Sequence, residues 1–348
     1  MVDKAYAMSS FLQFRAVYNH EVKFAEHIDI PHRVDVSLFD ARIPINTSEQ
    51  LCEHIKNSVE REAARGKAAL ALSGGIDSAI CAKFMPKGSV AYTFKCVVPG
   101  RKVTDETEKA KKFCETNGLE QRVVEVYWED FETYAPLLMR HKNAPIHSIE
   151  VQIYKAALAA KNDGFDTFIF GEGADAMLGG LSSLLSKDYV LGDFAERYSF
   201  VLPYKVLKDF LIVTEPFENF CDENGFIDTH GFIEQQFFWE YINSYCNACE
   251  CAGIAFSTPF SSLIHKPLDI QRVRSGDSKY LVREVFKKLY PDMKMAEKTP
   301  MPRPVDEWFE NWDGPKRPEF WPNCHVNMTG DQKYYIWILE KFLNEFNI

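Results

Sequence analysis

The segment from Ala69 to Ser78, which reads ALALSGGIDS, is the one that decides the fold of this chain. Its apolar run has about the length of one buried strand. The residues that follow, IDSAICAKFM, carry apolar side chains at helical spacing, so the two glycines lie at a strand-to-helix turn. The first N–H groups of a helix have no partner within the helix, and the helix dipole favours negative charge there. The turn therefore predicts an anion-binding loop.

The residue types in this loop indicate that the anion is a phosphate. Glycines leave no Cβ between backbone and ligand, and serine hydroxyls add hydrogen-bond donors. Phosphates repel the carboxylate of Asp77 unless a divalent cation lies between them, so Asp77 predicts Mg²⁺ carried in with a nucleotide. An ordinary glycine-rich turn is the alternative, and six suitable residues in the right local context favour phosphate binding over it. The expected nucleotide contacts are Leu72, Ser73, Gly74, Gly75, Asp77 and Ser78.

The composition indicates a globular protein of 348 residues, 46% of them hydrophobic, that can bury one large core or two moderate ones. It has neither an apolar stretch of membrane-spanning length nor an apolar signal core, so we expect a cytoplasmic protein without membrane contact. Its nine cysteines, an odd number, indicate reduced thiols rather than a disulfide framework. The net charge of −10 makes nucleic acid an unlikely partner, although Lys266 to Arg303 holds ten basic and five acidic residues.

Residues 1–45 are predicted to form a strand-rich N-terminal extension that is too short to be a domain alone. The segments FLQFRAVY (11–18) and PHRVDVSLFD (31–40) both have the composition of strands.

Residues 46–186 alternate between helical and strand patterns, which predicts a nucleotide-binding core. A helix from about Ser48 to Gly66 leads into the ALAL strand, and further strands are expected at 90–98, 121–128 and 165–170. Strands that alternate with helices form βαβ units, so the fold class is predicted as α/β, with a doubly wound, mainly parallel sheet. Residues 187–348 are mostly helical and aromatic in pattern, and we expect them to cover the sheet as part of the same domain.

A second glycine-rich segment, GEGADAMLGG, occupies 171–180 directly after the predicted strand at 165–170. Loops at the carboxyl ends of parallel strands face the ligand in such folds, so Gly171 is a further candidate for nucleotide contact. A flexible turn would also use glycines, but it would not need Glu172 and Asp175 beside them.

Both loops resemble those of known enzymes. SGGIDS lacks the spacing of a Walker loop and resembles the SGGxDS loop of N-type ATP pyrophosphatases, which cleave ATP between its α and β phosphates. GEGADAMLGG resembles the GEGxDExxGG segment of the asparagine synthetase family, whose relatives include β-lactam and lasso-peptide synthetases. Further similarity to this family lies in AYTFKCVVPG, TDETEKA, KYLVREVF and AEKTPMPRP, and the resemblance extends from about residue 45 to 310.

The resemblance implies a reaction and a set of roles. ATP and Mg²⁺ would adenylate a small-molecule or peptide carboxylate, pyrophosphate would leave, and ammonia or an amine would displace AMP. A separate glutaminase is a possible ammonia source. The implied roles are metal binding by Asp77 and Asp175, adenine binding near Cys96, orientation or deprotonation of the amine by Glu172, and charge stabilisation by Lys298.

Several departures from the family pattern keep other functions open. Ala176 replaces the usual second glutamate of GEGxDE, and the aspartate-binding region of the family is not recognisable. The chain begins Met1-Val2 rather than with a nucleophilic cysteine, so we expect no glutaminase activity from it. One alternative is sulfur insertion into tRNA, favoured by the CNACEC cluster of Cys246, Cys249 and Cys251, although buried apolar thiols suit that cluster better than a metal. The other alternative is a catalytically inactive relative.

Overall fold

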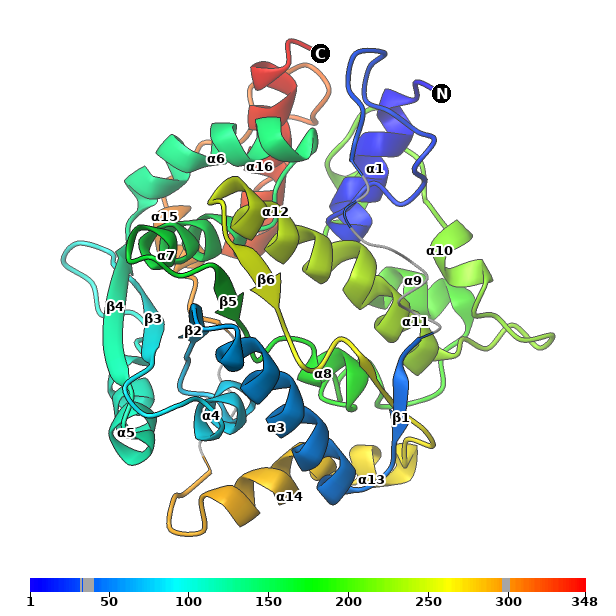
Figure 1. Ribbon diagram of the computed structural model, residues 1–348. Coiled ribbons are helices and arrows are strands. Elements are labelled where there is room, and N and C mark those ends of the chain that lie inside the picture. The colour runs from blue at the N-terminus through cyan, green and yellow to red at the C-terminus, as the bar shows by residue number, and fades with distance from the viewer. Residues whose placement is uncertain (32, 34–40, 296–300) are drawn as a thin grey trace.

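The computed structural model describes residues 1–31, 33, 41–295 and 301–348 (Figure 1). A five-stranded sheet lies at its centre, and all of its neighbouring strands are parallel. The spatial order of the sheet is β4 (Glu120–Val126), β3 (Val90–Cys96), β2 (Ala68–Ala71), β5 (Thr167–Ile169) and β6 (Ala255–Ser257). This arrangement confirms the predicted α/β class with a parallel, doubly wound sheet.

Strand β2 lies in the middle of the sheet because its side chains are apolar and can be covered on both faces. Leu70 is fully buried and pairs with Ala91 of β3 on one side and Ile169 of β5 on the other. The chain continues from β2 to β3 and β4 in one direction, and later returns to add β5 and β6 on the other side. The order therefore reverses between β2 and β5, which is where open α/β sheets form a ligand crevice.

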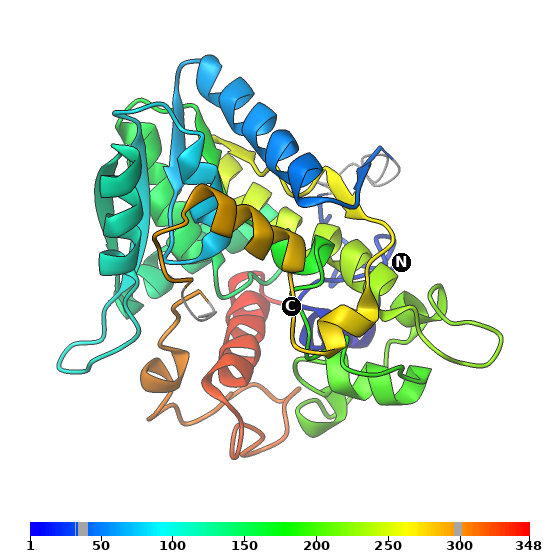
Figure 2. The same ribbon diagram turned by 90° about the horizontal axis from the view of Figure 1, so that it is seen from below.

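Helices cover both faces of the sheet. One layer consists of α3 (Ser48–Ala64), α4 (Ile76–Lys83), α5 (Thr107–Asn117) and α14 (Tyr280–Leu289), and Figure 2 shows α14 beside α3 and α4. The opposite layer consists of α6 (Trp128–Lys142), α7 (Glu150–Asn162) and α12 (Asn243–Cys251). Helices from residues 48 to 289 thus pack on the two faces of one sheet.

The helix ends agree with the sequence signals. Helix α3 begins with a capping box, in which Thr47 and Gln50 each bond the other's backbone N–H. Gly66 follows its end with a φ of +95°, and Gly118 closes α5 with a φ of +68°, conformations that suit glycine.

The prediction of a strand in FLQFRAVY is wrong. Residues Lys4–Phe14 form helix α1, which begins where the Asp3 side chain accepts a hydrogen bond from the Tyr6 N–H and ends at Arg15 with a φ of 60°. All residues from 6 to 14 are buried, so α1 has no polar face and lacks the periodicity that identifies an amphipathic helix. The second predicted strand, 31–40, lies largely outside the described residues. A strand does follow at β1 (Ile43–Ile45), which pairs in parallel with β7 (Leu263–His265).

The C-terminal half is largely helical, as predicted, and remains continuous with the core because it supplies β6 to the central sheet. Helix α16 lies beside α1 in this part of the molecule (Figure 1). The helices described in this half are α8 (Ala174–Met177), α9 (Leu191–Tyr198), the 3₁₀ turn Pro203–Lys205, α10 (Glu215–Glu218), α11 (Thr229–Phe237), the π-helical turn Phe238–Ile242, α12, α13 (Ile270–Arg274), α14, α15 (Val305–Trp308) and α16 (Gly330–Glu345).

Among the described residues, no helix is both long enough and apolar enough to span a membrane. All nine cysteines carry free thiols.

Candidate functional site

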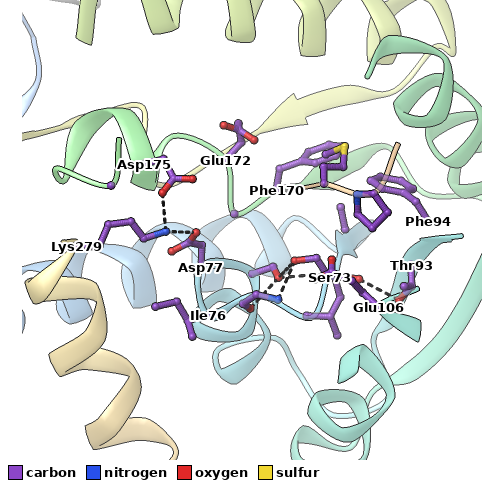
Figure 3. Close-up of a pocket in the computed structure, with 18 of the residues that line it drawn as sticks. Ser73, Ile76, Asp77, Thr93, Phe94, Glu106, Phe170, Glu172, Asp175 and Lys279 are labelled. Atoms are coloured by element: carbon purple, nitrogen blue, oxygen red, sulfur yellow. Dashed lines mark hydrogen bonds and ion pairs between the residues drawn. The ribbon is translucent and has the colours of Figure 1, made fainter. Parts of the chain in front are cut away.

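A pocket opens at the carboxyl edge of the sheet, between the loops that follow β2 and β5 (Figure 3). The two strands are neighbours in a parallel sheet, so their carboxyl ends bring the two predicted loops to one place. The predicted residues that line the pocket are Leu72, Ser73, Gly75, Asp77 and Ser78 from the first loop and Gly171, Glu172 and Asp175 from the second.

Internal hydrogen bonds hold the loop after β2 in shape. The Ser73 and Ser78 hydroxyls lie 3.0 Å apart, and the Ser73 backbone N–H donates to Ser78 Oγ over 3.1 Å. The Gly75 N–H donates to Ser73 Oγ over 3.1 Å, and Gly75 is the N-cap of α4. The serines therefore preorganise the loop in addition to serving as potential ligand donors.

Two glycines allow close packing around this loop. A Cβ on Gly74 would lie 2.7 Å from Cδ of Lys109, so this glycine makes room for the side chain of Lys109 on α5. Gly74 does not line the pocket, and its predicted contact with the nucleotide stays a prediction. A Cβ on Gly171 would lie 2.5 Å from the Ser78 backbone nitrogen. Real Cβ contacts are longer than this, so Gly171 permits the loops after β2 and β5 to touch.

Lys279 joins the two aspartates of the site. Its Nζ lies 2.5 Å from Asp77 Oδ2 and 3.1 Å from Asp175 Oδ1, and Figure 3 shows the three side chains directed toward one another. Burial alone would lower the pKa of Lys279, but the two carboxylates outweigh it and hold that pKa above its usual range. Gly180 makes the contact possible, because a Cβ there would lie 2.4 Å from Cδ of Lys279.

The donor set of Asp77 and Asp175 fits a divalent cation. Their carboxylates come from neighbouring loops and converge on one positive charge, that of Lys279. Mg²⁺ prefers oxygen ligands and is commonly bound by one or two carboxylates together with substrate phosphates. A nucleotide bound at the glycine-rich loop that carries Asp77 would bring such phosphates to the same place.

Glu172 is held from a third direction, by helix α12. The Tyr245 hydroxyl donates to Glu172 Oε2 over 2.7 Å, and the Gly173 N–H donates to Oε1 over 3.2 Å. Burial raises the pKa of Glu172, the Tyr245 hydrogen bond opposes that rise, and the neighbouring Asp175 adds to it. The carboxyl group is thus fixed in orientation and takes up a proton more readily than an exposed glutamate.

The other end of the pocket is mostly apolar. Phe94 at the end of β3 and Phe170 at the end of β5 lie on the same side of the pocket in Figure 3, and Thr93, Met301 and Pro302 also line it. Cys96 lies near this end without lining it. Its Sγ bonds Gln152 Oε1 over 3.3 Å and the Pro302 carbonyl over 3.2 Å, and burial raises its pKa to about 12.

Lys298 lies outside the described residues. Met295 and Met301, on either side of that gap in the description, both line the pocket. Three further residues, Tyr245, Lys279 and Arg283, line the pocket without having been predicted as site residues. Tyr245 has no local sequence signal, whereas Lys279 and Arg283 belong to the KYLVREVF segment. Similarity of that segment to the family motif was the signal that could have assigned them.

The parallel sheet, the glycine-rich loop at its order reversal and the second acidic loop define an α/β protein of the nucleotide-binding class. A sequence model of the asparagine synthase family matches residues 50–250, more than half of the chain, and the protein belongs to this family. The family implies the use of ATP. No curated protein matches the chain.

Three solved structures are similar to parts of this chain at low identity. The NH₃-dependent NAD synthetase of Campylobacter jejuni, in complex with a nitrate ion, is 12% identical with a TM-score of 0.26, over 74% of this chain and all of its own. The NMN synthetase of Francisella tularensis is 11% identical with a TM-score of 0.28, over 73% of this chain and 99% of its own. The U34-tRNA thiolase NcsA of Methanococcus maripaludis, with its [4Fe-4S] cluster, is 16% identical with a TM-score of 0.26, over 72% of this chain and 83% of its own.

Proposed function

We propose that this protein is an ATP-dependent carbon–nitrogen ligase. It adenylates a substrate carboxylate, releases pyrophosphate, and joins the acyl group to ammonia or an amine with release of AMP. Its family supports the use of ATP. The observation that carries the proposal is the meeting of Asp77, Asp175 and Glu172 at one phosphate loop, because this chemistry needs both a metal-binding pair and a separate base.

In the first step, the loop after β2 binds the pyrophosphate portion of ATP. Ser73, Gly75, Ile76 and Ser78 line the pocket that the phosphates would enter, so the N–H groups at the start of α4 and the serine hydroxyls are the expected donors to them. Asp77 and Asp175 would hold Mg²⁺, which would supply positive charge to offset the negative charge of the phosphates. The adenosine would lie toward Thr93 and Phe94, which line the pocket on the same strand that carries Cys96.

In the second step, Glu172 acts on the amine. The amine nitrogen attacks the acyl carbon, the bond to AMP breaks with its electron pair on the phosphate oxygen, and Glu172 accepts a proton from the nitrogen. The raised pKa of Glu172 suits this role, since a general base works best with a pKa near the operating pH. Tyr245 orients the carboxylate. Lys298 stabilises negative charge on the phosphate and the attacked carbonyl.

The acceptor is a small-molecule or peptide carboxylate, and the amine is free ammonia, ammonia from a separate glutaminase, or an amine substrate. An amine in the same molecule as the carboxylate would give ring closure. Mg²⁺ and ATP are the required cofactors.

The alternative of tRNA thiolation has less support. The basic segment 266–303 has many of its cations engaged within the protein, since Arg272 pairs with Asp277 and Arg274 pairs with Asp188. Cys249 is buried in α12, and burial raises the pKa of its thiol, so it suits the core better than a reactive site.

The alternative of an inactive relative rests on Ala176. This residue is buried in α8 and does not line the pocket, whereas Asp175 beside it does. The loss of a glutamate at this position therefore leaves the three acidic groups of the proposed mechanism in place.

A pyrophosphate-release assay tests the function. The protein is incubated with ATP, Mg²⁺, ammonium and a library of carboxylates, with reactions lacking carboxylate as controls. We expect pyrophosphate and AMP to form together with an amide of at least one acceptor. Formation of amide with ADP as the nucleotide product would contradict adenylation, and thiolation of tRNA without amide formation would favour the alternative enzyme.

A further inference from the structure

Lys279 lies between the two carboxylates to which the proposed function assigns the metal. Its ammonium is within hydrogen-bond distance of Asp77 and Asp175, and its side chain is only 8% exposed. The three residues belong to different elements: Asp77 to the first turn of α4, Asp175 to α8 and Lys279 to the N-cap of α14. The positive charge of Lys279 thus offsets negative charge on two carboxylates that the fold brings together.

The backbone around Lys279 sets the start of its side chain. Lys279 has a φ of 53° and a ψ of 36°, a conformation uncommon for a residue with a side chain, and its carbonyl accepts the Arg283 N–H of α14. The stem then passes Gly180, where a Cβ would obstruct Cδ. The ammonium is therefore directed to the aspartates by the fold, while the four-carbon stem leaves it able to turn.

A divalent cation and this ammonium compete for the same oxygens. Mg²⁺ and Mn²⁺ bind carboxylate oxygens at about 2 Å, and Nζ lies 2.5 Å from Asp77 Oδ2, so a metal on that oxygen would lie within about 4.5 Å of Nζ in its present position. Like charges at that separation repel strongly in a partly buried site. Metal binding between the aspartates therefore requires the ammonium to move.

We propose that Lys279 is an internal counter-ion that makes tight metal binding depend on nucleotide. Phosphates on the loop after β2 offer the ammonium new oxygen partners, and its departure frees both carboxylates for the metal. This inference rests on the metal role that the proposed function gives to Asp77 and Asp175. Binding is reciprocal in such coupling, so metal and nucleotide raise each other's affinity by the same factor.

The test measures protein-bound Mn²⁺ by electron paramagnetic resonance, with and without an ATP analogue whose α–β bridge cannot be cleaved. Mn²⁺ bound by the analogue alone is subtracted. We expect wild-type protein to bind Mn²⁺ at least about tenfold more tightly with the analogue than without it. Lys279→Met removes the competing charge, so it should bind Mn²⁺ alone about tenfold or more tightly than wild type does and depend less on the analogue.

Lys287→Met is the matched control, because Lys287 lies on the same helix and is exposed. It should behave as wild type. Equal wild-type affinity for Mn²⁺ with and without the analogue would overturn the inference while leaving the proposed function intact, as would a Lys279→Met variant no tighter than wild type. Lys279→Gln, which also removes the charge, is measured in the same way if Lys279→Met does not fold. Failure to bind Mn²⁺ under any condition would instead remove the metal site, and with it both proposals.

Discussion

The Tyr245 hydroxyl donates a hydrogen bond of 2.7 Å to Glu172 Oε2, across 73 residues of sequence. This bond favours the ionised form of Glu172, whereas burial and the nearby Asp175 favour the protonated form. Burial is the larger influence, so the pKa of Glu172 lies above its ordinary value. The tyrosine thus limits the rise in the pKa of the proposed base.

The pH dependence of kcat should report this balance. Glu172 accepts a proton only when it is ionised, so kcat should fall as the pH falls through its raised pKa. Tyr245→Phe removes a bond that lowers that pKa, so the acidic limb should move to higher pH. Measuring kcat against pH for wild type, Tyr245→Phe and the exposed-site control Tyr204→Phe tests this. An acidic limb that stays in place or moves to lower pH in Tyr245→Phe would contradict the role of Glu172 as base.

Replacement of either aspartate of the proposed metal site should abolish turnover. Asp77→Ala and Asp175→Ala each leave Mg²⁺ short of a ligand beside a highly charged anion, and we expect kcat to fall by about a hundredfold or more. Asp188→Ala is the control, because its carboxylate is 76% exposed and pairs only with Arg274 among the ion pairs described. Pyrophosphate release is the measurement, and near-normal rates in both aspartate variants would refute the two-loop metal site.

Gly171→Ala should separate the two loops. Its Cβ would approach the Ser78 nitrogen to 2.5 Å, so backbone must shift, at a cost of about 1–3 kcal/mol in stability. Binding of the uncleavable ATP analogue should weaken, as measured by calorimetry, and Tm should fall. Gly192→Ala in α9 is the control, because no atom lies within 4 Å of the added Cβ. An unchanged analogue affinity in Gly171→Ala would show that the contact between the loops does not shape the nucleotide site.

Lys298→Ala should lower kcat by about a hundredfold with little change in ATP affinity, because a cation that acts on transition-state charge contributes little to ground-state binding. Lys294 is exposed and lies four residues before Lys298, so Lys294→Ala should change neither kcat nor ATP affinity appreciably. Steady-state kinetics and analogue binding for both variants give the comparison. Equal and modest effects would assign Lys298 to the solvated surface.

The two loops could be predicted because their signals are local. ALALSGGIDS and GEGADAMLGG each combine an apolar strand end with glycines and an acid, and parallel neighbours place such loops at one edge. The sheet followed from the alternation of strand and helix patterns for the same reason.

The partners of the two loops could not be predicted in this way, since they depend on long-range packing. Tyr245 donates its hydrogen bond to Glu172 from helix α12. The composition of that helix is typical of a core helix and carries no signal for a role in the site. Helix α1 was mistaken for a strand because burial on all sides removes the polar face that marks an amphipathic helix. The packing of the Lys109 side chain against Gly74, which leaves no room for a Cβ there, is another long-range contact without a local signal.

Cleavage of ATP between its α and β phosphates is the central claim, and the nucleotide product tests it most directly. ATP labelled at the α phosphate is incubated with the protein, Mg²⁺, ammonium and the carboxylate library, and the labelled products are separated by chromatography. The account predicts labelled AMP in amounts equal to the pyrophosphate released, both lost in Asp77→Ala. Labelled ADP as the sole product would contradict it.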